Sequence, residues 1–210
     1  MTAEPQILAT CDAARVLDSG GVLLLETDTL PGFHCRVDRP GGMARIVDLK
    51  GRTPEKPFLL LAGSLEQALG VCGPLAARQA SYCRQCWPGP FSLILPAGEQ
   101  LPPEAVSVTG GVAIRVPTGD RLSALLVAVG VPLVSTSANR AGDAPLGDLA
   151  DAWSAFDDAV DGVWTSSPDT LRLDAESPGV VPAASGLVDL TTWPPQVLRE
   201  GPRKAPDPAC

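Results

Sequence analysis

Three cations lie close together in a chain that is otherwise poor in lysine. Lys50, Arg52 and Lys56 fall within seven residues, and Lys204 is the only other lysine in the sequence. Arginine offers a planar fork of donors and lysine a mobile point charge, so the two together suit phosphate. The same cations could instead be solvated and complement the C-terminal end of a preceding helix. The segment taken alone leaves both interpretations open.

A second polar cluster, Ser135-Thr-Ser-Ala-Asn139, directly follows the apolar run at 131–134. Ligands of open α/β sheets bind beyond the carboxyl ends of the strands, and hydroxyl and amide groups there can fix a phosphate, a ribose or an amino acid. Serine or asparagine at such a position can equally cap a helix. Thr27-Asp-Thr29 repeats the polar pattern after the apolar run at 22–25.

Arg115 interrupts the apolar run at 112–116. A cation in a buried strand costs much free energy unless an anion lies beside it. Its partner is either a carboxylate of the protein or a bound substrate, and the sequence does not choose between the two.

Several common kinds of site are not indicated. The chain has no GxxxxGK[ST] loop and no GxGxxG after a strand. Its single histidine, His34, argues against a Ser-His-Asp triad or a metallo-hydrolase, and we expect this ring to pack in a strand. Cys83 and Cys86 form a lone CxxC pair, which we interpret as one face of a helix in a reducing compartment. No metal site and no tightly bound cofactor are expected.

The bulk properties limit the possible partners. The 210 residues are 45% apolar and 19% charged, which predicts one domain with a substantial core. A net charge of -8 argues against non-specific binding to nucleic acid or to anionic membranes. No apolar run approaches the roughly 20 residues of a membrane span, and the N-terminus lacks the pattern of a signal peptide. These properties predict a cytoplasmic protein.

Apolar runs and helical patterns alternate along the chain and must position these polar groups. Strands are predicted at 22–25, 58–62, 91–95, 112–116, 131–134, 180–190 and 196–199. Helices are predicted at 7–19, 41–50, 64–86, 121–129 and 149–156. This alternation predicts an α/β layer fold in one domain covering 1–201, followed by a loose Pro-rich tail at 202–210.

Seven short motifs occur in an order that resembles the YrdC-like family, the threonylcarbamoyl-AMP synthases. That family reads PTDT-x-YGL, LKxRP…KPL, GPxTxIL, RxP, SAN, STVVD and LRxG. The corresponding segments are Glu26–Phe33, Leu49–Phe58, Gly89–Leu95, Arg115–Pro117, Ser137–Asn139, Ser185–Asp189 and Leu198–Gly201. Each motif is weak alone, but seven in order form a specific signal. The resemblance implies a twisted mixed β-sheet flanked by helices around a concave basic cavity, in the short form without an extra C-terminal domain.

The resemblance also implies residue roles and a reaction. The family's KxR…SxN tetrad falls on Lys50, Arg52, Ser137 and Asn139, which would be the catalytic set. The ATP contacts would be Lys50, Arg52, Lys56, Ser137, Asn139 and Arg199, and the threonine contacts Thr29, Arg115, Ser135 and Ser185. The reaction joins L-threonine, bicarbonate or CO2, and ATP with Mg²⁺ into threonylcarbamoyl-AMP and pyrophosphate, for modification of adenosine 37 in tRNA. The implied partner is a downstream threonylcarbamoyl-transferase, with weak or absent direct tRNA binding.

The chain departs from the family pattern mostly on the threonine side. Glu26 and Pro31 replace the usual Pro and Tyr of the first motif. Leu61 stands where many members have His, and Gly186 replaces the Thr of STVVD. These changes keep open the alternative of a paralogue that activates a different substrate with ATP. A non-catalytic nucleotide- or RNA-binding module is a further alternative.

Overall fold

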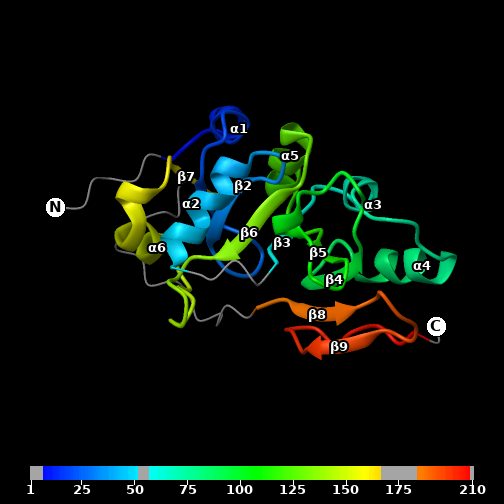
Figure 1. Cartoon of the computed structure of the whole chain (residues 1–210). Coiled ribbons are helices and arrows are strands. Elements are labelled where there is room, and N and C mark those ends of the chain that lie inside the picture. The colour runs from blue at the N-terminus through cyan, green and yellow to red at the C-terminus, as the bar shows by residue number, and fades with distance from the viewer. Residues whose placement is uncertain (1–6, 52–56, 167–183, 209–210) are drawn as a thin grey trace.

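A nine-stranded mixed sheet runs through the part of the chain that the computed structural model describes, residues 7–51, 57–166 and 184–208 (Figure 1). The strands are β1 (Leu23–Leu25), β2 (Gly32–Arg36), β3 (Leu59–Leu61), β4 (Phe91–Pro96), β5 (Gly111–Arg115), β6 (Leu133–Ser137), β7 (Val163–Trp164), β8 (Gly186–Asp189) and β9 (Gln196–Arg199). Their order across the sheet is β7-β1-β2-β6-β3-β5-β4-β8-β9. The α/β class and the mixed sheet implied by the resemblance are therefore confirmed.

Six α-helices and two short 3₁₀ turns accompany the strands in the described ranges. They are α1 (Thr10–Asp18), α2 (Pro40–Lys50), α3 (Leu65–Gly70), α4 (Ala77–Cys86), α5 (Asp120–Val129), α6 (Leu149–Phe156), η1 (Pro103–Ala105) and η2 (Asp157–Ala159). Of these, α1 and α5 cover one face of the sheet with their apolar sides. The other face packs against α2, α3, α4 and α6. Strand β1 is buried on both sides, which explains its unbroken apolar run.

Strand pairing decides which side chains share the face that α1 and α5 cover. Directly opposed residues of neighbouring strands point to the same face of a sheet. Ser135 pairs with His34 on one side and Leu59 on the other, so these three side chains share one face. Leu61 pairs with Leu133 and with Arg115 on that same face. Leu61 and Leu133 pack in the α1/α5 core, whereas Ser135 lines a cavity.

Two differences from the prediction concern the polar clusters. Strand β2 was not predicted, because Pro31-Gly32 has the residue types of a turn, yet the segment Gly32–Arg36 pairs along its whole length with β6. The strand predicted at 131–134 runs on to Ser137, so the hydroxyls of the second cluster lie inside β6 and not after it. The helix-cap interpretation of that cluster is therefore wrong, since the next helix begins only at Leu149.

The remaining differences concern segment ends and short elements. The helix predicted at 64–86 is split into α3 and α4, in agreement with the breakers Gly73 and Pro74 between them. The two-residue strand β7 was not predicted, because so short a run carries no periodic signal. Helix α6 has the predicted bounds.

Residues 202–208 lie along α4. The hydroxyl of Tyr82 donates to the carbonyl of Pro206 at 3.1 Å, and the Arg203 guanidinium lies 4.7 Å from the centre of the Phe91 ring.

Cys83 and Cys86 are buried free thiols. Burial raises the pKa of each to about 12, so both stay protonated near neutral pH. Within the described ranges, no helix combines the length and apolar character that crossing a bilayer requires.

Candidate functional site

A cavity of about 300 Å³ opens on the sheet face that α1 and α5 leave partly uncovered. It collects six of the predicted site residues: Thr29, Arg115, Ser135, Ser137, Ser185 and Arg199. They come from the β1–β2 connection, from β5 and β6, and from the ends of β8 and β9. Of the other four, Arg52 and Lys56 lie outside the described residues, while Lys50 and Asn139 contact Ser137 from behind the cavity wall.

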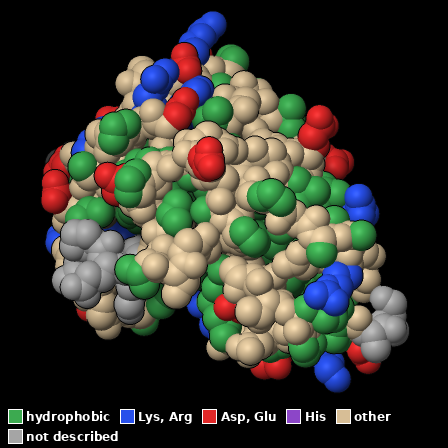
Figure 2. Space-filling view, turned by 45° about the vertical axis from the view of Figure 1, so that its right-hand side comes forward, with side chains coloured by type: hydrophobic (Ala, Val, Ile, Leu, Met, Phe, Trp, Pro, Cys, Tyr) green, Lys and Arg blue, Asp and Glu red, His purple; other side chains and the backbone are tan. Residues whose placement is uncertain are grey.

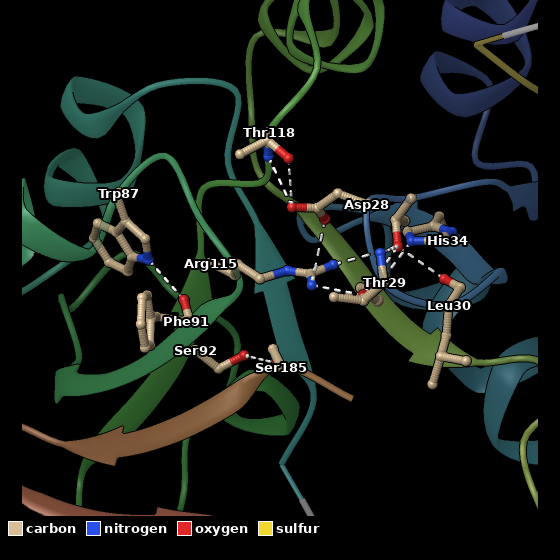
Figure 3. Close-up of polar contacts among 12 residues, drawn as sticks. Asp28, Thr29, Leu30, His34, Trp87, Phe91, Ser92, Arg115, Thr118 and Ser185 are labelled. Atoms are coloured by element: carbon tan, nitrogen blue, oxygen red, sulfur yellow. Dashed lines mark hydrogen bonds and ion pairs between the residues drawn. The ribbon is translucent and has the colours of Figure 1, made fainter. Parts of the chain in front are cut away.

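Arg115 is the most buried cation of the cavity, with 2% of its surface exposed. Its Nη1 donates to Thr29 Oγ1 at 2.6 Å and lies 3.4 Å from Asp28 Oδ1 (Figure 3). Asp28 is itself held by Thr118, whose backbone N–H and hydroxyl both donate to Oδ2. A carboxylate of the protein therefore faces Arg115, which is one of the two kinds of partner that the sequence allowed.

That carboxylate does not fully satisfy the guanidinium. Among the described residues, Arg115 Nε is buried and has no hydrogen-bond partner. The pKa of Arg115 is lowered, first by burial and also by the nearby charge of Arg199, against the raising effect of Asp28. Among the described residues, the cations Arg115 and Arg199 therefore face one cavity in which Asp28 is the carboxylate close to Arg115. An anionic ligand between them would relieve this repulsion.

Lys50 acts on the opposite end of the site. Its ammonium donates to Ser137 O at 2.7 Å, Asn139 O at 2.9 Å and Asn139 Oδ1 at 3.0 Å. The backbone N–H of Ala141 returns a bond to the Lys50 carbonyl at 2.7 Å. Lys50 is only 6% exposed, so it fixes the end of β6 and the following turn from inside the protein.

The end of α2 determines where Lys50 lies. The helix ends in Gly51, whose φ of 57° is left-handed, a conformation that glycine adopts without a Cβ penalty. Lys50 lies in the last turn of α2 with its side chain buried, and the helix ends directly after it. Lys50 and the SxN motif, 87 residues apart in sequence, therefore meet at the end of α2.

Ser137 and Asn139 hold each other in place. The Ser137 hydroxyl donates to Asn139 Oδ1 at 2.6 Å, and Asn139 Nδ2 donates to the carbonyls of Arg140 and Asp143. Since Lys50 can only donate, the amide orientation of Asn139 follows from this network. The lone pairs of Ser137 Oγ are then the part of the hydroxyl left for a ligand.

Ser135 contacts the sole histidine. Its Oγ lies 3.0 Å from His34 Nε2, and His34 Nδ1 lies 2.9 Å from the Gly32 carbonyl. His34 is completely buried in β2, as predicted for a ring packed in a strand. Burial lowers its pKa to about 3, in spite of the Gly32 hydrogen bond and with a further contribution from Arg115. The ring is neutral near pH 7 and serves as a hydrogen-bonding group.

The C-terminal strands β8 and β9 bring Ser185 and Arg199 to the cavity. Ser185 Oγ lies 2.8 Å from Ser92 Oγ, and Arg199 Nε donates to the Ser185 carbonyl at 3.0 Å. The motif glycine Gly201 passes so close to Gly186 that a Cβ on Gly201 would overlap the Gly186 backbone. This close approach brings the segments that bear Ser185 and Arg199 together.

Sequence reasoning missed three residues that the site uses. Ser92 and His34 touch predicted site residues, and Asp28 was noted only as part of a polar run. Ser92 lies in a predicted strand between the apolar residues Phe91 and Leu93. A single hydroxyl in such a strand gives no distinct sequence signal, whether it is buried or exposed.

Another hollow, of about 590 Å³, lies between α2 and the end of α6 and is lined by Arg45, Asp48 and Phe156 among others. None of the predicted site residues lines it. On the face shown in Figure 2, charged side chains of both signs are scattered without a continuous basic patch. Size alone therefore does not identify the site, and the convergence of polar groups does.

The mixed sheet and its cavity, which two arginines and several hydroxyls line, define an α/β protein with a polar pocket that carries cationic side chains. The chain belongs to the Sua5/YciO/YrdC family, described as telomere recombination, whose model matches residues 15–201. The threonylcarbamoyl-AMP synthase of Chromohalobacter salexigens is 35% identical over 149 residues, which are 71% of this chain and 80% of that protein. The enzyme of the same name from Chromobacterium violaceum is 34% identical over 148 residues, covering 70% and 77%.

Solved structures show the same fold. Sua5 of P. abyssi in complex with L-threonine matches with a TM-score of 0.78 at 24% identity, over 91% of this chain and 54% of that one. YciO of E. coli matches with a TM-score of 0.77 at 21% identity, over 95% and 94%. The expectation of a YrdC-like fold is confirmed.

Proposed function

We propose that this protein is a threonylcarbamoyl-AMP synthase. It takes L-threonine, bicarbonate or CO2, and ATP, and forms threonylcarbamoyl-AMP and pyrophosphate. The observation that carries the proposal is the cavity in which Arg115 and Arg199 lie together with the hydroxyls of Ser135 and Ser137. The names of the curated relatives and the L-threonine bound to Sua5 support it.

The Arg115 end of the cavity would hold the amino acid. A buried guanidinium with one unsatisfied N–H suits a carboxylate, which could accept a charge-assisted hydrogen bond there. Thr29 and Asp28 keep the guanidinium in place. Ser135 and Ser185 add hydroxyls around the rest of a small polar substrate.

The Ser137 end would hold the nucleotide. Lys50 keeps Ser137 and Asn139 rigid and places a positive charge behind them. The predicted ATP contacts Arg52 and Lys56 follow directly in sequence, and Arg199 lines the same cavity. Mg²⁺ would arrive on the phosphates as part of the ATP substrate.

The chemistry requires no imidazole base. The threonine amine adds to CO2 to give a carbamate and releases one proton. A carbamate oxygen then attacks the α-phosphorus, the bond from that phosphorus to the β-phosphate bridging oxygen breaks, and pyrophosphate leaves with its electrons. The protein aligns the two substrates and stabilises the charge on the phosphates. His34 is held in two hydrogen bonds, which agrees with this division of labour.

Pyrophosphate release, measured with ATP and bicarbonate for one amino acid at a time, tests the proposal. We expect release with threonine and its loss in Arg52→Ala, whereas Arg15→Ala, on the exposed face of α1, retains it. Release with another amino acid only would favour the paralogue. Binding of nucleotide or RNA without release would favour the non-catalytic module, and near-normal turnover of Arg52→Ala would refute the role of Arg52.

The expected setting follows from the same proposal. The product is an activated, hydrolysable mixed anhydride, so a transferase must consume it soon after release. We propose a cytoplasmic enzyme that hands its product to such a threonylcarbamoyl-transferase, with weak or absent direct contact to tRNA. The net charge of -8 supports the last point.

A further inference from the structure

The hydrogen bond between His34 and Ser135 has a direction that the surroundings determine. Ser135 lines the cavity with 8% of its surface exposed, while His34 lies fully buried on the neighbouring strand. The two atoms involved, Ser135 Oγ and His34 Nε2, are 3.0 Å apart. Either atom could donate if the pair were isolated, so the partner of the other ring nitrogen decides.

That partner is a backbone carbonyl. His34 Nδ1 lies 2.9 Å from Gly32 O, which can only accept a hydrogen bond. Nδ1 must therefore carry the ring proton, because two facing acceptors at this distance would repel. In a neutral ring the proton on Nδ1 leaves Nε2 as an acceptor. The Ser135 hydroxyl then donates to His34.

From this geometry we infer that His34 presents Ser135 Oγ to the cavity as a hydrogen-bond acceptor, and that Ser135 accepts a hydrogen bond from a donor group of the amino-acid substrate. The inference rests on the proposed function and deepens it. His34 is a positioning residue, since it acts on the substrate through Ser135. The hydroxyl proton is already used, so Ser135 is poorly suited to bind a carboxylate or a phosphate oxygen.

The arrangement separates two halves of an amino-acid site. Arg115 supplies donors for a carboxylate, and Ser135, across β3 on the same sheet face, supplies an acceptor. The donor that meets Ser135 is either the substrate nitrogen or the threonine hydroxyl. Both donors share this chemistry, and they can be told apart with threonine analogues.

The tautomer can be observed without any variant. His34 is the only histidine of the chain, so protein labelled with ¹⁵N-histidine gives a single pair of ring signals. We expect the proton on Nδ1 and an unprotonated Nε2 near pH 7. A proton on Nε2 would overturn the inference, because Ser135 would then be the acceptor of that bond and free to donate to a ligand.

A variant series measures the effect on the substrate. His34→Phe keeps a ring in place but removes the acceptor, so we expect KM for threonine to rise about five- to tenfold, the value of one hydrogen bond, with KM for ATP unchanged. His34→Gln offers an acceptor again and should recover part of the loss. In the Ser135→Ala background, His34→Phe should add nothing further.

Substrate analogues identify the donor. If 2-aminobutyrate, which lacks the hydroxyl, shows the same rise in KM as threonine in His34→Phe, the donor is the substrate nitrogen. If only threonine shows it, the donor is the hydroxyl. An unchanged threonine KM in a folded His34→Phe refutes the inference alone. Absence of threonine-dependent pyrophosphate release in the unaltered protein refutes the proposed function instead.

Discussion

The ammonium of Lys50 lies 3.0 Å from the side-chain oxygen of Asn139, and it donates at the same time to the carbonyls of Ser137 and Asn139. One cation at the end of α2 thus binds three oxygens at the end of β6. The lysine that the sequence suggested as a phosphate ligand has a positioning task in the structure. Contact with a phosphate remains a prediction.

Replacement of Lys50 should therefore affect both stability and activity. Lys50→Met leaves three buried oxygens without this donor, and we expect the free energy of unfolding to fall by about 2–4 kcal/mol. Urea denaturation measures the fall. Pyrophosphate release should be lost even at urea concentrations well below the unfolding midpoint of the variant, where it is still folded. Lys204→Met, at an exposed position, is the matched control and should change neither quantity. Full stability in Lys50→Met would contradict the anchoring role.

Arg115 should control amino-acid binding. Arg115→Gln removes the charge and the fork, and we expect KM for threonine to rise about 30- to 100-fold, which corresponds to about 2–3 kcal/mol. Arg115→Lys should recover little, because an ammonium cannot reproduce the bonds to Thr29 and Thr27 together. Arg15→Gln, in an exposed ion pair, serves as the control. If ATP binding weakened while the threonine KM stayed the same, the two ends of the site would be reversed.

Gly186, at the start of β8, and Gly201, just beyond the end of β9, should respond differently to alanine. A Cβ on Gly201 would overlap the backbone of Gly186, whereas a Cβ on Gly186 would meet Phe91 at an ordinary 3.4 Å. Gly201→Ala should therefore lower the melting temperature by several degrees and displace Arg199, while Gly186→Ala is tolerated. Thermal denaturation and the ATP KM of both variants check this. Equal stability of the two would show that the strands separate easily.

The stability of the fold should depend on pH through His34. Its pKa is 6.5 when unfolded and about 3 in the folded protein, so below pH 6.5 the unfolded chain takes up a proton that the folded chain refuses. The contribution is complete above pH 6.5 and is lost as the pH falls toward 3. Between pH 7 and pH 5 we expect a loss of about 2 kcal/mol in the free energy of unfolding.

Urea denaturation at several pH values, for the unaltered protein and for His34→Phe, isolates this contribution. The variant should show a much flatter profile between pH 5 and pH 7, because it lacks the only histidine of the chain. An equally steep profile in the variant would assign the pH dependence to other groups.

Much of the fold could be predicted from residue order. Apolar runs such as 58–62 and 91–95 become buried strands, and the pattern at 149–156 becomes α6 with the same bounds. Strand β2 escaped prediction because Pro31-Gly32 has turn chemistry and the segment lacks alternation. It is a strand because it lies between β1 and β6 and pairs with both. Tertiary pairing overrode local propensity there.

The sequence by itself determined the chemical inventory: few lysines, one histidine, and hydroxyl-rich segments next to apolar runs. Only the tertiary structure decided which of these groups meet. Ser135 and His34 are 101 residues apart, and Lys50 and Ser137 are 87 apart, yet strand order and the end of α2 bring each pair into contact. Within one strand, successive side chains point to opposite faces of the sheet. Which side chain of another strand lies beside a given one depends on how strands distant in sequence pair. The cations were thus visible as candidates from the start, while the proton direction at Ser135 and the anchoring by Lys50 required the assembled sheet.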